Sequence, residues 1–292
     1  MGACMRYLTL GLCLCVQLVA DGLSNWQAAE NPPAAQVMQE RIGTWTYNSG
    51  KTRSEQTGRL IEYTPADWNH KDALPLIVFL HGAGARTAYK DTIEALYLEF
   101  IPAEIRRGRS VNAILLCPQV DSYWGDQGAE ILDQALEHYG DRIDPDRVYL
   151  TGLSSGGGGT WRAAVLRHEI LAAAIPICGI RTSVDRDSQL IPLPIWAFHN
   201  RHDPYQSVDY TRAHVQAIKA AGGQHIHYTE YEETPGHSHK GKQGELVYPK
   251  CHPHAWETAY QDERLWTWLF NQRKGKPERA LVMPPISEVD SP

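Results

Sequence analysis

The sequence predicts an α/β fold in which helices cover both faces of a mostly parallel sheet. From residue 58 onward, short apolar strands alternate with stretches of helical periodicity, which is the pattern of such a sheet. In addition, a strand near residue 150 runs directly into a glycine-rich turn and then into a helix. The composition agrees, because 42% hydrophobic and 21% charged residues over 292 positions indicate a globular chain and exclude disorder, collagen and coiled coil.

Each predicted element rests on its local pattern. Apolar runs bounded by turn residues predict strands at 59–63, 76–80, 113–117, 147–153, 172–177, 195–198 and 225–231. Apolar residues at helical spacing predict helices at 91–107, 127–139, 156–168, 208–221 and 255–272. The aromatic stripe of the last helix, which includes Trp256 and Trp266, is expected to pack in the core.

The two ends of the chain differ from the middle. Residues 7–20 form the only long apolar run, shorter than the roughly 20 residues that cross a bilayer as a helix. Because this run follows the positive Arg6, residues 1–22 are expected to be a signal peptide, which implies a secreted or periplasmic protein. A buried N-terminal helix is the alternative. We expect an N-terminal extension at 23–57, one α/β domain at 58–274 and a surface tail at 275–292.

Charge and cysteine content narrow the possible partners. Twenty-eight Lys and Arg against 34 Asp and Glu give a net charge of −6, and no basic block is present, so a nucleic acid partner is not expected. Of the six cysteines, Cys117, Cys178 and Cys251 follow the expected signal. Three thiols allow at most one disulfide within one chain, and their pairing stays open.

The segment RVYLTGLSSGGGGTW at 147–161 places G-x-S-x-G between a strand and a helix. A serine in such a strained turn presents its hydroxyl above the sheet, and only small neighbours such as Gly152 and Gly156 let the strand and helix pass closely. Ser154 is therefore the candidate nucleophile, and the Ser155 N–H at the helix N-terminus is a candidate donor to an oxyanion. A phosphate-binding loop is excluded, because neither glycine pattern of such loops is present.

A second glycine-rich turn follows the apolar strand 76–80. The turn reads HGAGA at 81–85, and its small residues allow a substrate to approach the backbone. We expect the Ala83 N–H to be the second oxyanion donor. His81 stands at the strand end and is expected to organise the turn rather than to act as a base.

These motifs, taken in order along the chain, resemble those of the secreted α/β-hydrolase carboxylesterases, a group that includes feruloyl esterase, polyhydroxyalkanoate depolymerase-like and prolyl-oligopeptidase-like proteins. The resemblance covers residues 57–274 and is carried by HGAGA, CPQ with the following Trp124, DPDRVYLTGLSSGG, IPICG, WAFH and the closing HAWETAY. It implies the α/β-hydrolase fold without a large lid, and a triad in the order serine, acid, histidine. It also implies that Trp124 lines the mouth of the site, although core packing of Trp124 is an equal alternative. The chain departs from the pattern at Ser155, Gly158 and Asn200.

The acid of the triad is assigned to Asp203. It stands in the first loop after the strand 195–198, where a carboxylate can orient an imidazole. Asp209 is the rival, but an acid near the start of a helix more often interacts with the helix dipole. His199 and His202 flank the same loop and are expected to be solvated.

The base of the triad has several candidates, because several histidines follow the last strand. The resemblance places the base three residues before Trp256, where this sequence has Pro253, so the base is displaced by one residue in either direction. We favour His254, keep His252 as the close alternative and leave His237 as a third candidate. Three H-x-H pairs, such as His225 with His227, suggest a structural metal as a weaker alternative. No metal and no cofactor are expected.

The sequence thus predicts a serine carboxylesterase that works through an acyl-enzyme. The expected partner is an ester, a small molecule or a polymer end, among acylated polysaccharide fragments, phenolic esters and polyester-type substrates, with no membrane partner after signal removal. A serine peptidase of the prolyl-oligopeptidase type is the first alternative, although residues 23–57 leave no room for the propeller of that family. A non-catalytic α/β-hydrolase binding module is the second.

Overall fold

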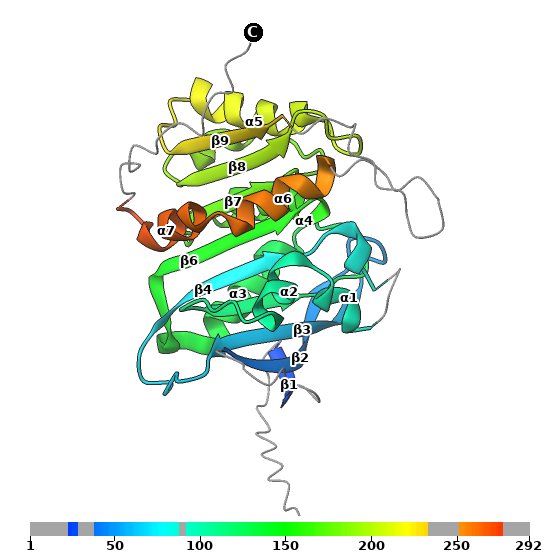
Figure 1. The fold of residues 1–292 in the computed structure, drawn as a ribbon, viewed down its shortest axis with the longest axis vertical. Coiled ribbons are helices and arrows are strands. Elements are labelled where there is room, and N and C mark those ends of the chain that lie inside the picture. The colour runs from blue at the N-terminus through cyan, green and yellow to red at the C-terminus, as the bar shows by residue number, and fades with distance from the viewer. Residues whose placement is uncertain (1–22, 29–37, 88–91, 233–250, 277–292) are drawn as a thin grey trace, which may run out of the picture.

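The computed structural model describes residues 23–28, 38–87, 92–232 and 251–276. Within these ranges a nine-stranded sheet runs through the molecule in the order β1-β2-β3-β5-β4-β6-β7-β8-β9 (Figure 1). The antiparallel side holds β1 (Leu23–Ala28), β2 (Met38–Asn48) and β3 (Glu55–Pro65), and β3 pairs antiparallel with β5. The parallel part holds β4 (Leu74–Leu80), β5 (Ile114–Pro118), β6 (Ile143–Leu153), β7 (Ala173–Ile177), β8 (Ile195–Asn200) and β9 (Ile226–Tyr231). The predicted α/β fold is confirmed.

Helices cover both faces of this sheet. One face carries α1 (Glu94–Tyr97), α2 (Phe100–Arg106), α6 (Cys251–Gln261) and α7 (Glu263–Asn271), and α6 and α7 cross in front of the strands in Figure 1. The other face carries α3 (Gln127–Tyr139), α4 (Ser155–Arg167) and α5 (Val208–Ala220). Short 3-10 turns complete the described elements: η1 (Ala83–Ala85), η2 (Gly140–Arg142) and η3 (Asp187–Leu190).

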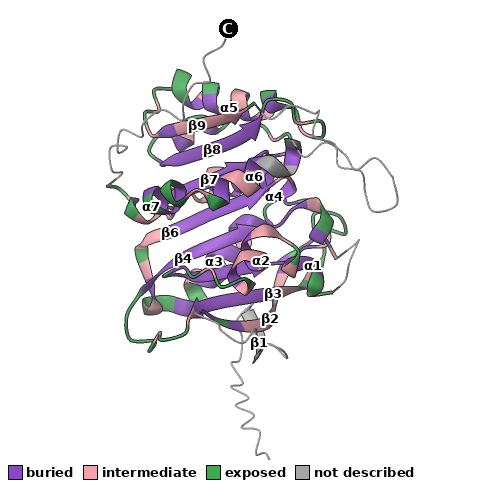
Figure 2. Ribbon diagram, viewed as in Figure 1, coloured by how far each residue is buried: buried purple, intermediate pink, exposed green. Residues whose placement is uncertain are grey.

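The central strands are buried on both sides, which explains their continuous apolar sequences. In β4, Leu76, Val78 and Leu80 pack on the α3–α4 side, while Ile77 and Phe79 pack on the side of α2 and α6. Figure 2 shows the same distribution, with buried residues along the central strands and exposed residues on outer helices and loops.

Some predicted boundaries were wrong for local reasons. The predicted helix 91–107 is two helices, because Glu99 adopts an extended conformation between α1 and α2. The predicted helix 255–272 begins earlier, at Cys251, and breaks at Asp262, whose side chain caps α7 by accepting from the Arg264 N–H. The strand β2 was not predicted, and residue 58, the expected start of the catalytic domain, lies inside β3.

Several sequence-based expectations lie outside the described residues: the signal peptide, most of the tail and His237. No helix among the described residues is long and apolar enough to cross a membrane. Cys117 and Cys178 are both buried free thiols, so they do not pair with each other.

One carboxyl group is buried where the antiparallel strands meet α3. Glu62 is 2% exposed, and it accepts a hydrogen bond from the Tyr139 hydroxyl and lies 3.6 Å from the Arg41 guanidinium. Burial raises the pKa of Glu62 to about 7, and Arg41 opposes this shift only in part. The folded protein therefore holds a proton on Glu62 in a pH range in which the unfolded chain has released it.

We expect this carboxyl to make folding stability fall with rising pH. Its contribution is fully present below its ordinary pKa and is lost as pH rises through about 7. Glu62→Gln removes this titration, so its stability relative to the parent chain should improve by up to about 3 kcal/mol between pH 4 and pH 8. Urea unfolding of both chains across that range measures the difference. Parallel stability curves would contradict the raised pKa.

Candidate active site

The candidate site lies where the strand order of the parallel sheet reverses. From β4 the chain proceeds to β5 on one side and then to β6 on the other, and in open α/β sheets ligands bind at the carboxyl ends of strands beside such a switch point. The register pairs Leu80 of β4 with Gly152 of β6. The two glycine-rich turns that follow these strands are therefore neighbours, although some 70 residues separate them in the sequence.

Ser154 occupies the strained turn between β6 and α4. Its φ of 53° and ψ of −114° lie in a region that residues other than glycine rarely adopt. The flanking glycines make this turn possible: a Cβ on Gly156 would stand 1.9 Å from the Leu80 carbonyl oxygen, and one on Gly152 would stand 2.5 Å from the Gly156 oxygen. This close approach of β4, β6 and α4 is the packing that the sequence predicted for a nucleophile elbow.

The backbone contact at Gly156 predicts a specific intolerance to substitution. Because backbone atoms cannot move aside as a flexible side chain can, Gly156→Ala should lower the free energy of unfolding by about 3 kcal/mol or more. Gly84→Ala is the matched control, since a Cβ there meets nothing within 4 Å, and it should change stability by no more than about 0.5 kcal/mol. Urea unfolding measures both, and equal stabilities of the two variants would contradict the packing described.

Three side chains from distant segments form one hydrogen-bonded chain at this turn. The Ser154 Oγ lies 3.0 Å from Nε2 of His252, and Nδ1 of the same ring lies 2.5 Å from Oδ2 of Asp203. Asp203 follows β8, as predicted, and its carboxylate oxygens also accept the N–H groups of Tyr205 and Gln206. Although burial raises the pKa of Asp203, hydrogen bonds from His199 and His252 hold it well below its usual range, so the carboxylate stays charged.

His252, the close alternative to the favoured His254, makes both contacts. The final helix was predicted to begin after both histidines, whereas α6 begins at Cys251 and includes both. His252 is 8% exposed and packs between the Tyr205 and Trp256 rings, whose centroids lie 5.4 and 4.9 Å from its own.

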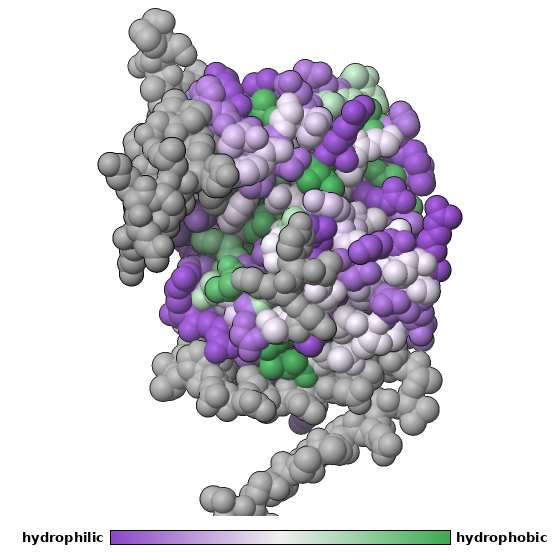
Figure 3. Space-filling view, turned by 90° about the vertical axis from the view of Figure 1, so that its right-hand side faces the viewer, coloured by the Kyte–Doolittle hydropathy of each residue, from purple (hydrophilic) through white to green (hydrophobic). Residues whose placement is uncertain are grey.

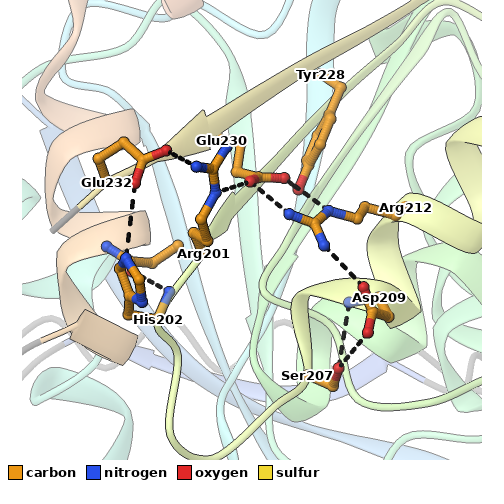
Figure 4. Close-up of polar contacts among 9 residues, drawn as sticks. Arg201, His202, Ser207, Asp209, Arg212, Tyr228, Glu230 and Glu232 are labelled. Carbon is orange, nitrogen blue, oxygen red and sulfur yellow. Dashed lines mark hydrogen bonds and ion pairs between the residues drawn. The ribbon is translucent and has the colours of Figure 1, made fainter. Parts of the chain in front are cut away.

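A network of charged side chains fixes the loop that carries Asp203 (Figure 4). Glu230 of β9 accepts hydrogen bonds from Arg201, at the start of the loop, and from Arg212 of α5, beyond its end, at 2.6 to 2.9 Å. Burial raises the pKa of Glu230, but these guanidinium groups together hold it at about 2. Arg201 also pairs with Glu232, and Arg212 pairs with Asp209 at 2.8 Å. Asp209, the rival candidate for the acid, is thus engaged with Arg212.

The turn after β4 is built around a buried neutral histidine. His81 is fully buried, its Nδ1 lies 2.6 Å from the Gly82 oxygen, and its Nε2 accepts the Val120 N–H over 3.2 Å. Burial lowers the pKa of His81 to about 4, which suits the organising role expected for it and not that of a base. The Gly82 N–H donates to Glu99 over 2.9 Å, and burial raises the pKa of Glu99 to about 7.

The two candidate oxyanion donors lie on the two turns described. Ala83 begins the turn η1, and Ser155 is the first residue of α4 and is buried. Sequence patterns did not identify Glu99 as a neighbour of this loop. No local signal could have shown it, because Glu99 reaches Gly82 only through the break between α1 and α2.

Trp124 does not line the mouth of the site. It is 4% exposed, donates its indole N–H to the His81 carbonyl over 2.9 Å, and packs against α4, where a Cβ on Gly159 would lie 2.5 Å from the Trp124 Cβ. The substrate-binding role expected for Trp124 is therefore corrected to core packing. Tyr205, whose ring centroid lies 5.4 Å from that of His252, is 50% exposed.

The carboxyl ends of the parallel strands lie on the right of Figure 1, and Figure 3 looks onto that side. Figure 3 shows hydrophobic residues exposed near the middle of this face, among hydrophilic ones. This is the face on which the turns after β4, β6 and β8 open.

One group of side chains has the spacing of metal ligands. Donor atoms of Cys178, Asp203 and His252 lie within 4.8 Å of one another. However, His252 Nδ1 is hydrogen-bonded to the Asp203 carboxylate. Burial raises the pKa of the Cys178 thiol, so the thiol keeps its proton. These residues therefore fit a hydrogen-bonded relay better than a metal site.

Comparison with known proteins gives the same fold. No protein-family model matches the chain. It is 33% identical to Carboxylesterase 1E of Rattus norvegicus over 70 residues, which are 24% of this chain and 12% of that protein. The solved structure of a thermostable esterase matches with a TM-score of 0.58 and 28% identity, over 80% of this chain and 63% of the other. The chain thus spans less than two thirds of the length of these relatives.

Two other solved structures share the fold alone. A putative dienelactone hydrolase from Klebsiella pneumoniae matches with a TM-score of 0.51 and 16% identity, over 80% of this chain and 99% of that one. Dipeptidyl peptidase 4 from Porphyromonas gingivalis matches with a TM-score of 0.53 and 12% identity, over 79% and 35%. The chain has the α/β-hydrolase fold. Within that class, the likeness that goes beyond a shared fold is to esterases.

Proposed function

We propose that this protein is a serine carboxylesterase in which Ser154, His252 and Asp203 form the catalytic triad. The observation that carries the proposal is the continuous chain from the Asp203 carboxylate through His252 to the Ser154 hydroxyl, with distances of 2.5 and 3.0 Å. A serine in a strained turn, a base within hydrogen-bond reach and an acid that orients the base are the parts that nucleophilic acyl transfer requires.

The geometry assigns a role to each group. The charged Asp203 accepts the Nδ1–H of His252, which leaves Nε2 free to take the Ser154 proton as the hydroxyl attacks an ester carbonyl. The oxyanion that forms is stabilised by the Ala83 and Ser155 N–H groups and by the N-terminus of α4. His252 then returns the proton to the leaving alcohol, and water hydrolyses the acyl-enzyme by the same steps.

The alternatives are less well supported. Likeness to a dipeptidyl peptidase is a likeness of fold, so it carries no preference for peptides. A non-catalytic binding module has no need of a strained serine hydrogen-bonded to a buried His–Asp pair, and maintaining that strain costs on the order of 1–3 kcal/mol.

The substrate is proposed to be an ester outside the cytoplasm. A signal peptide at residues 1–22 would deliver the enzyme to the periplasm or the medium, where acylated polysaccharide fragments, phenolic esters and polyester ends occur. Tyr205 takes the place of Trp124 as the aromatic side chain that a substrate ring or chain would meet, because it is half-exposed and adjoins His252.

The test is hydrolysis of p-nitrophenyl butyrate by the parent chain and by single variants. Ser154→Ala and His252→Ala should each lower kcat by roughly four orders of magnitude, because each removes a member of one catalytic unit. His254→Ala is the matched control and should leave kcat nearly unchanged.

Circular dichroism of each variant confirms that the fold is retained. Loss of activity in His254→Ala, with His252→Ala still active, would contradict the assignment of the base. A folded parent chain that hydrolyses no p-nitrophenyl ester would contradict the esterase proposal.

A further inference from the structure

A second histidine contacts the acid of the proposed triad. His199, near the end of β8, is fully buried, and its Nε2 lies 3.3 Å from Oδ2 of Asp203. This is the same oxygen that His252 contacts from the other side. The expectation that His199 is a solvated loop residue was therefore wrong, because β8 extends to Asn200 and includes it.

The neighbours of His199 determine where its proton lies. Besides Asp203, Nε2 faces the Gln206 carbonyl oxygen at 3.0 Å, and Nδ1 lies 2.8 Å from the Thr211 hydroxyl. A carboxylate and a carbonyl can only accept, so Nε2 must carry the proton. With the proton on Nε2, Nδ1 can accept the Thr211 hydroxyl hydrogen. From β8, the His199 ring thus contacts both the loop that carries Asp203 and the helix α5.

This arrangement leaves Asp203 little freedom. Its Oδ1 accepts the backbone N–H groups of Tyr205 and Gln206 at 2.9 and 3.0 Å, and His199 contacts Oδ2. His199 also holds the Gln206 carbonyl, so the loop is restrained on both sides of the carboxylate. Rotation of the carboxylate would break these contacts together, and Oδ2 is thereby kept directed at His252.

We propose that His199 is a positioning residue, which fixes the Asp203 carboxylate and through it the His252 imidazole for proton transfer with Ser154. This inference rests on the proposed function. Because His199 is fully buried and reaches the reacting atoms only through Asp203, its loss should reduce the rate of the chemical step and leave substrate binding unchanged.

The chain offers a matched control in His214 of α5. It is 2% exposed, and its ring lies 2.7 Å from Asp187 and 2.8 Å from the Thr182 hydroxyl, so it makes the same kinds of contact as His199. It also stacks on Trp161 at 4.3 Å. None of these partners belongs to the proposed triad, so His214→Leu reports the cost of losing a buried histidine alone.

The experiment compares kcat, KM and thermal midpoint for the parent chain, His199→Leu, His199→Gln and His214→Leu with p-nitrophenyl butyrate. His199→Leu should lower kcat by roughly 10- to 100-fold with KM little changed, since it misplaces the acid without removing it. His199→Gln should recover most of the loss, because its amide can donate from the position of Nε2 to both Asp203 and Gln206. His214→Leu should lower the thermal midpoint and keep kcat.

A further variant keeps the test decisive if His199→Leu does not fold. Thr211→Val preserves shape and removes only the hydroxyl that holds Nδ1, so it should lower kcat below that of the parent chain without a change in KM, and a parental kcat in this variant would overturn the proposal. A parental kcat in His199→Leu would overturn the proposal. Equal kcat losses in His199→Leu and His214→Leu, or no recovery with Gln, would overturn it as well.

Failure of the proposed function would look different. It would appear in the parent chain, as hydrolysis that is absent or that survives Ser154→Ala, before any substitution at His199. The positioning role would then fall with it.

Discussion

The close approach of three backbones beside Ser154 is the constraint on which the rest of the structure depends. The end of β4, the end of β6 and the first turn of α4 meet at glycines whose Cβ atoms would stand 1.9 to 2.5 Å from backbone atoms. This packing sets the strained dihedral angles of Ser154 and places the turn after β4 next to the elbow. The strand order switches at this point, and ligands bind at the carboxyl ends of strands beside such a switch. The same strand arrangement therefore determines both the fold and the position of the candidate site.

The proposed acid and base come from segments that lie farther along the chain than Ser154. Asp203 lies on a loop after β8 that is held from outside by the Arg201–Glu230–Arg212 network and from inside by His199. His252 lies in the first turn of α6, which packs across the opposite face from α4. The buried side chains of Asp203 and His199 each have several hydrogen-bond partners, so the loss of one contact weakens the others.

Sequence patterns predicted most of this where the cause is local. Continuous apolar strands such as β4 and the glycine turn at Ser154 are encoded by adjacent residues, and the helix at 127–139 was found with its bounds. The errors lie where distant contacts decide. The start of α6 before His252, the burial of His199 and Trp124, and the contact of Glu99 with Gly82 all depend on tertiary packing. The strand β2, which lies between β1 and β3, was missed because it has no continuous apolar run: its buried positions include Glu40 and Gly43.

The most direct test of the account is a crystal structure of the enzyme after reaction with a p-nitrophenyl phosphonate, which mimics the tetrahedral intermediate. We predict a covalent bond from phosphorus to the Ser154 Oγ, with the phosphonyl oxygen about 2.7–3.1 Å from the Ala83 and Ser155 nitrogens. The His252 ring should remain between the phosphorus-bound Ser154 Oγ and the Asp203 carboxylate. An unmodified Ser154, or an adduct whose phosphonyl oxygen points away from both N–H groups, would contradict it.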